Sequence, residues 1–197
     1  MQLTFTVVPL PMTAAEKFNE AVYFFNQMES TVNNTRTFPF NLSAFLSALR
    51  STTFYLQAQY KRKPGFEEWY ARQRESMASD PVLKMLKDIR TEAVHQRPVN
   101  LLVKSGPRFH EDPIVTDHLE IALTSDPAAN IAWNYRVGKD GDERSAEPIT
   151  DWELENGGGS VLAACRHGLS KIGYLLRQCR ALFEPVPGEP IAGATPT

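Results

Sequence analysis

The sequence predicts a mainly α-helical protein, an up-down bundle of about five helices with a small antiparallel β insertion. Apolar residues recur at three- and four-residue spacings over several long segments, which is the pattern of amphipathic helices. Between residues 99 and 155 this pattern gives way to short apolar runs separated by glycine and proline turns, which is typical of strands. We expect a single domain over 1–183 with 99–155 as its insert. The proline- and glycine-rich residues 184–197 should form a disordered tail.

Capping residues indicate where the helices begin. Thr13 is followed three residues later by Glu16, which is the capping-box pattern. Asp80 precedes Pro81, and proline is favoured at the first helical position because its missing N–H needs no acceptor there. The predicted helices cover residues 13–33, 41–60, 66–78, 81–96 and 160–183. The predicted strands cover residues 101–103, 119–123, 131–137 and 149–154, with a further short strand or extended arm over 2–8.

Charge and cysteine content limit the classes of partner and compartment. The net charge is −2, but residues 1–97 carry 12 Lys and Arg against 9 Asp and Glu, whereas residues 98–197 carry 9 against 14. A polyanion should therefore prefer the first half of the chain. Cys165 and Cys179 are fourteen residues apart in one predicted helix, about 21 Å, so they cannot form a disulfide with each other. We expect free thiols, no signal peptide, no membrane span and a cytoplasmic protein.

An arginine and a histidine near the end of the fourth predicted helix are the strongest candidates for chemistry. Arg90 and His95 are five residues apart, about 140° around a helix axis at ~100° per residue. They can border one shallow cleft if a partner helix lies between them. A histidine can exchange protons near neutral pH, and an arginine can bind phosphate with two hydrogen bonds.

The order of the helices and this Arg-x4-His pair resemble the HEPN superfamily of helical domains. The segment Phe40 to Gln57 looks like the second helix of that group, and Leu83 to His95 looks like its motif helix. The resemblance implies a metal-independent endoribonuclease of the toxin type, or an RNA-binding descendant of one. It also implies a homodimer that places both copies of Arg90 and His95 in one cleft, with a nucleotidyltransferase-type antitoxin as a further partner. No metal or cofactor is expected.

Three further residues are expected to support this site. Arg50 lies among small residues in the second predicted helix, and we expect it to pair with Asp88 or Glu92. Glu92 and His95 also have the Glu-x-x-His spacing of di-iron bundles, but such a site needs a second copy of the pair, which the sequence lacks.

The alternative function is that of a non-catalytic helical binding or scaffold protein. It is favoured by Thr91, which stands where the HEPN pattern has Asn, Asp or His, and by the acidic total charge.

Overall fold

The fold is known from a computed structural model that describes residues 13–95, 101–108, 119–125, 130–137, 142–154 and 159–184. Five helices and four strands lie within these ranges, so the prediction of a mainly helical protein with a small antiparallel sheet is confirmed. In chain order they are α1 (Ala14–Ser30), α2 (Thr37–Tyr60), α3 (Phe66–Ser79), α4 (Pro81–His95), β1 (Leu101–Arg108), β2 (Leu119–Ser125), β3 (Ile131–Val137), β4 (Arg144–Leu154) and α5 (Val161–Phe183).

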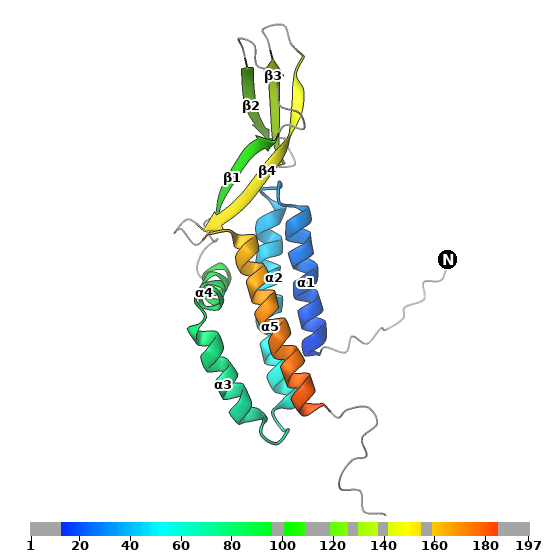
Figure 1. Cartoon of the computed structure of the whole chain (residues 1–197), viewed down its shortest axis with the longest axis vertical. Coiled ribbons are helices and arrows are strands. Elements are labelled where there is room, and N and C mark those ends of the chain that lie inside the picture. The colour runs from blue at the N-terminus through cyan, green and yellow to red at the C-terminus, as the bar shows by residue number, and fades with distance from the viewer. Residues whose placement is uncertain are drawn as a thin grey trace, which may run out of the picture.

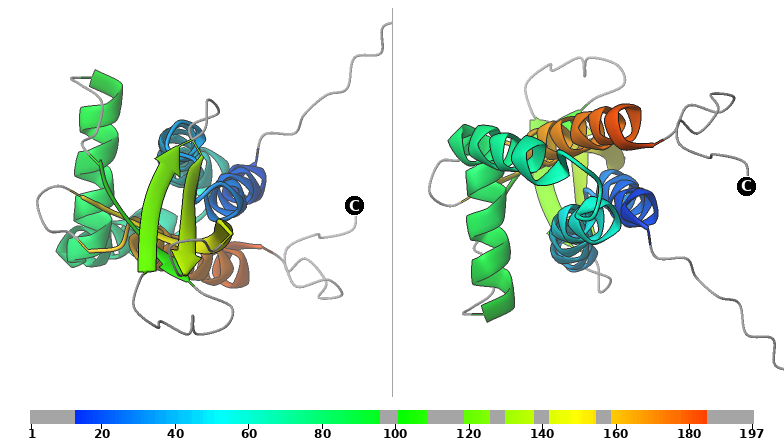
Figure 2. Two further views of the ribbon diagram at one scale, coloured as in Figure 1. Left: turned by 90° about the horizontal axis from the view of Figure 1, so that it is seen from above. Right: turned by 90° about the horizontal axis from the view of Figure 1, so that it is seen from below.

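Helices α1, α2 and α5 lie side by side along the length of the molecule (Figure 1). Helix α3 contacts α2 and α5 through Phe66, whose ring packs against those of Tyr60 and Phe183. Helix α4 lies across the end of α3 rather than along the bundle (Figure 2). Because α4 crosses the other helices, the predicted up-down arrangement is not confirmed. This crosswise helix carries four of the five predicted site residues: Asp88, Arg90, Glu92 and His95.

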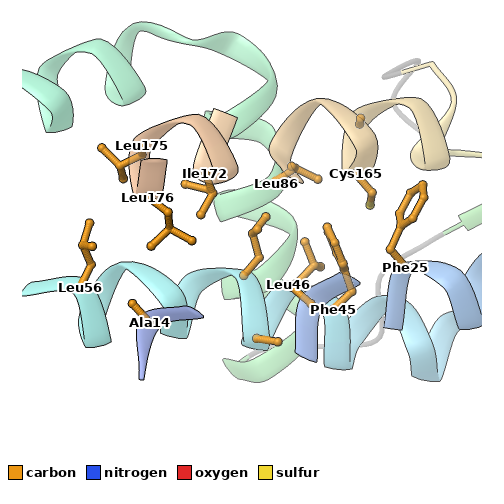
Figure 3. Packing of buried hydrophobic residues seen from close by; sticks show 14 of the residues in the cluster. Ala14, Phe25, Phe45, Leu46, Leu56, Leu86, Cys165, Ile172, Leu175 and Leu176 are labelled. Carbon is orange, nitrogen blue, oxygen red and sulfur yellow. The ribbon is translucent and has the colours of Figure 1, made fainter. Parts of the chain in front are cut away.

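The core lies between α1, α2 and α5 (Figure 3). Phe25 of α1, Phe45 of α2 and Ile172 of α5 are all buried there, because each sits on the apolar face of its helix. Both cysteines are buried free thiols, as predicted.

Helix caps agree with the sequence. The Thr13 hydroxyl accepts a hydrogen bond from the Glu16 N–H at 3.1 Å, and the Ser160 hydroxyl caps α5. Helix α2 begins at Thr37, earlier than the predicted residue 41. Pro39 is tolerated in this first turn because the first N–H groups of a helix have no acceptor within it.

The four strands form an antiparallel sheet in the order β1-β4-β3-β2, which we call the β arm. The arm projects from one end of the helices (Figure 1). Its base is anchored by Trp152 of β4, whose ring stacks on Phe38 of α2 with 4.4 Å between the centroids. The indole N–H donates to the Val32 carbonyl at 2.7 Å, and the Ile131 N–H donates to the Asn33 carbonyl at 2.8 Å. Strands β3 and β4 of the insert therefore pack against the connection between α1 and α2.

Two predicted segments, residues 2–8 and nearly all of 184–197, lie outside the described residues. The fourth strand begins at Arg144 rather than at residue 149. Among the described helices, none has the length and apolarity needed to cross a bilayer.

Candidate functional site

Arg90, the central residue of the predicted site, lies on α4 and lines a pocket. It is half-buried, and its Nε is buried with no hydrogen-bond partner among the described residues. His95 is the last residue of α4. The position of its imidazole lies outside the described part of the chain, so the pairing of Arg90 with His95 stays a prediction.

The pocket has a volume of about 580 Å³ and lies between α2, α3 and α4, with one residue from α5. Most of its wall is apolar. The apolar wall consists of Leu46, Leu49, Phe54, Met77, Ala78, Leu83, Leu86 and Ile172. Such a wall can take up an apolar or aromatic group of a ligand.

Five basic side chains also line this pocket, and no aspartate or glutamate is among the described residues that line it. We call them the pocket cations: Arg50, Arg74, Lys84, Lys87 and Arg90. Three of them come from α4 at intervals of three residues, which puts neighbouring side chains on one face of a helix. The other two come from α2 and α3. The fold therefore gathers the small basic excess of the first half of the chain around one cavity.

Within the described residues, the pocket cations form no ion pair with a carboxylate. The guanidinium of Arg50 lies 4.3 Å from the centroid of the Phe54 ring and donates to the Thr53 hydroxyl at 3.3 Å. The expected pairing of Arg50 with Asp88 or Glu92 was therefore wrong. Arg50 does not need a carboxylate partner, because the Phe54 ring one turn along the same helix offers a face for its guanidinium.

Asp88 and Glu92 do not line the pocket, although both lie on α4. The Asp88 side chain is exposed, and that of Glu92 is half-buried. The expected supporting role of these two carboxylates is therefore not seen at the pocket, where a negative charge would compete with an anionic ligand for the cations.

Three uncharged polar residues, Thr53, Gln57 and Tyr70, line the pocket beside the cations. Gln57 donates to the Thr53 carbonyl at 3.2 Å and to the Tyr70 hydroxyl at 3.1 Å. Burial raises the pKa of Tyr70 above its ordinary value, although the charges of Arg50 and Arg74 act in the opposite direction. Tyr70 is thus a neutral hydroxyl at physiological pH.

Arg74, Lys84 and Lys87 were not predicted as site residues from the sequence. A signal was present for the two lysines, because they share with Arg90 the three-residue spacing of one helix face. The sequence carries no such signal for Arg74, because the position of Arg74 at the pocket depends on how α3 packs against α4.

The fold and the pocket together define a helical protein that carries a β arm and a largely apolar pocket, lined by cations that form no ion pair within the part of the chain that the structure describes. The chain belongs to the family described as bacteriophage lambda protein ea47, whose family model matches residues 8–125. That match includes every pocket-lining residue except Ile172. The comparisons with curated proteins and with solved structures each found no match.

Proposed function

We propose that this protein is RNA-directed and that the pocket cations bind the phosphates of an RNA strand. The observation that carries the proposal is the gathering around one pocket of five cations that have no carboxylate partner among the described residues. Clustered like charges repel one another, so an arrangement of this kind is favourable once an anion is bound. Arginine and lysine are the side chains that neutralise nucleic-acid phosphates, and arginine does so with two hydrogen bonds.

The resemblance to the HEPN superfamily adds a catalytic form of this proposal. In that form the protein is a metal-independent endoribonuclease, cytoplasmic and homodimeric, with a nucleotidyltransferase-type antitoxin as partner. Arg90 would stabilise the negative charge of the phosphorane, and His95 would transfer a proton. The unpartnered Nε of Arg90 at the pocket supports the first of these roles.

The alternative is a protein that binds without catalysis. It is favoured by Thr91, which follows Arg90 directly. The Thr91 hydroxyl donates to the Lys87 carbonyl of its own helix at 3.0 Å. It therefore does not take the place of the polar group that the HEPN pattern has next to its arginine.

RNA binding can be tested by fluorescence anisotropy with a labelled single-stranded oligoribonucleotide. Arg74→Ala should weaken binding about tenfold, or ~1.4 kcal/mol, and should reduce the slope of log K against log salt by about 0.7. The matched control is Arg72→Ala, which removes an exposed arginine two residues away that does not line the pocket. Equal effects of the two substitutions would refute the proposal.

Catalysis needs a separate measurement of RNA cleavage in the presence of a chelator. The endoribonuclease proposal expects cleavage by the wild-type chain and none by His95→Ala. Binding that depends on Arg74, without any cleavage by the wild-type chain, would instead support the non-catalytic alternative.

A further inference from the structure

We infer that the pocket holds the base of one unstacked nucleotide, with the phosphates on either side of that nucleotide bound by the pocket cations. This inference rests on the proposed function and specifies what the same site recognises. It goes beyond phosphate binding because it assigns a role to the apolar wall. The ligand class is a nucleotide, which combines a flat, weakly polar base with a charged phosphate.

The size and the wall of the pocket exceed what a phosphate group requires. A volume of about 580 Å³ falls in the range of roughly 300–1,000 Å³ that is typical of small-molecule sites. Leu49 of α2, Met77 of α3 and Leu83 of α4 all contribute to the wall. A bound phosphate would gain nothing from these side chains, because ions prefer polar surroundings. A base can bury its faces against them.

An aromatic ring and a guanidinium provide a surface for stacking. Phe54 lines the pocket and yet is 51% exposed, an unusual environment for a phenylalanine. Arg50 lies over its ring at 4.3 Å. Unpaired bases stack on aromatic rings and on guanidinium planes, and both are present here within one helical turn.

Gln57 supplies a polar group that can read the edge of a base. Its amide nitrogen donates both hydrogens, to the Thr53 carbonyl and to the Tyr70 hydroxyl. The Thr53 carbonyl can only accept, which fixes the orientation of the amide. The Gln57 side-chain oxygen accepts no hydrogen bond from the described residues, so it is available to an N–H group of a base.

The test compares a fluorescein-labelled oligouridylate with an oligonucleotide of the same length whose nucleotides lack their bases. Both strands carry the same phosphates, so the difference in affinity reports the bases alone. The loss of stacking should weaken binding about 5- to 100-fold. Affinities within about twofold of each other would overturn the base pocket.

A second variant locates the effect. Ala78 is an exposed residue in the last turn of α3 that lines the pocket, so Ala78→Trp should fill the cavity without disturbing the core. The intact strand should then bind no better than the strand without bases. Ala181→Trp, an exposed alanine in the last turn of α5 outside the pocket, is the control and should leave the difference unchanged.

The outcomes separate this inference from the proposed function. If neither strand binds, RNA binding itself is refuted. If the two strands bind with equal affinity and their binding depends on Arg74, RNA binding is supported and the base pocket is refuted. Uridine monophosphate distinguishes the two sources of a nucleotide. Uridine monophosphate that binds as tightly as the oligouridylate, and no longer binds after Ala78→Trp, would show that the pocket recognises a free nucleotide. That result would refute an RNA strand as the ligand.

Discussion

The imidazole of His167 on α5 and the carboxylate of Asp80, which caps α4, form a hydrogen bond of 2.8 Å. One oxygen of this carboxylate accepts from the N–H groups of Val82 and Leu83, at 3.0 and 3.1 Å. The other oxygen faces His167 and also the ammonium of Lys171, at 3.5 Å. A single side chain thus starts α4 and fixes that start to α5. Since α4 carries three of the pocket cations, this contact also positions one wall of the pocket.

Asp80 should make the stability of the protein depend on pH in the acid range. Burial by itself raises the pKa of Asp80, but the hydrogen bond from His167 and those from the backbone outweigh it and lower this pKa to about 2. The unfolded value is about 3.9, so the stabilisation is complete above pH ~4 and is lost as the pH falls toward 2. Urea unfolding at a series of pH values should show this loss.

The control for this experiment is Asp80→Asn. Asparagine caps a helix about as well as aspartate but does not titrate. Every other carboxylate contributes equally to both proteins, so the difference between their pH profiles isolates Asp80. The variant should lose less stability between pH 4 and pH 2 than the wild type, and parallel profiles would contradict the assignment.

Trp152 should be the residue that holds the β arm on the helices. Trp152→Ala removes the stacking on Phe38 and the hydrogen bond to Val32, and should lower the free energy of unfolding by about 3–5 kcal/mol. The comparison is Leu123→Ala on β2, an exposed leucine whose loss should change stability by no more than about 0.5 kcal/mol. Chemical denaturation measures both, and similar values for the two would show that the arm is not anchored there.

Local features of this fold could be predicted from the sequence, and long-range ones could not. Thr13 and Asp80 identify helix starts, because a cap involves only a side chain and the next few N–H groups. The strands of the β arm could be located because turn residues separate them. Their order, β1-β4-β3-β2, depends on which edges pair, and turn residues do not encode this.

The crosswise position of α4 and the pocket beneath it belong to the long-range features. Helix α5 approaches α4 at Gly168, where a side chain would meet Leu86 and Leu49. The spacing of apolar residues gives the face that a helix buries, but not the angle at which it crosses its neighbour. Arg90 could therefore be predicted from its motif as a candidate site residue, whereas Arg74, from another helix, could not.

Gly168→Ala should disturb both stability and the pocket. A Cβ atom at this position would lie 2.8 Å from a methyl group of Leu86 and 3.1 Å from one of Leu49. Overpacking of this kind costs about 1–3 kcal/mol, against a gain of up to ~1 kcal/mol from the better helix propensity of alanine. We expect a net loss of about 1 kcal/mol in the free energy of unfolding, and weaker RNA binding because both leucines line the pocket.

Gly173→Ala is the matched control, since its Cβ would meet the Phe18 ring at 3.0 Å, away from the pocket. RNA binding by this variant should equal that of the wild type. A Gly168→Ala protein that is more stable than the wild type would show that Leu86 and Leu49 can move to make room for the Cβ atom. The angle at which α4 crosses α5 would then not depend on this glycine.

The two cysteines should be inert in the folded protein. Burial raises the pKa of Cys165 to about 12, and burial together with the negative charge of Glu184 raises that of Cys179 to about 12. The thiolate is the reactive form, so a thiol reagent such as Ellman's should label neither residue under native conditions and both in urea. Rapid native labelling of one thiol would show that α5 opens locally at that position.

Arg90→Met should weaken RNA binding while leaving the fold intact or making it more stable. Arg90 is half-buried, its Nε has no hydrogen-bond partner among the described residues, and four other cations line the same pocket. Methionine keeps an unbranched apolar chain against the pocket wall. It removes the charge repulsion between Arg90 and the other pocket cations, and also the unsatisfied Nε–H donor. We expect an unfolding free energy that is unchanged or higher by about 1 kcal/mol, with an RNA affinity about tenfold lower.

Lys104→Met, which breaks the 2.6 Å ion pair with Glu153 on the β arm, is the control and should leave RNA affinity unchanged. If Arg90→Met instead destabilises the protein by more than about 2 kcal/mol, the arginine supports the fold and its position at the pocket is not explained by ligand binding.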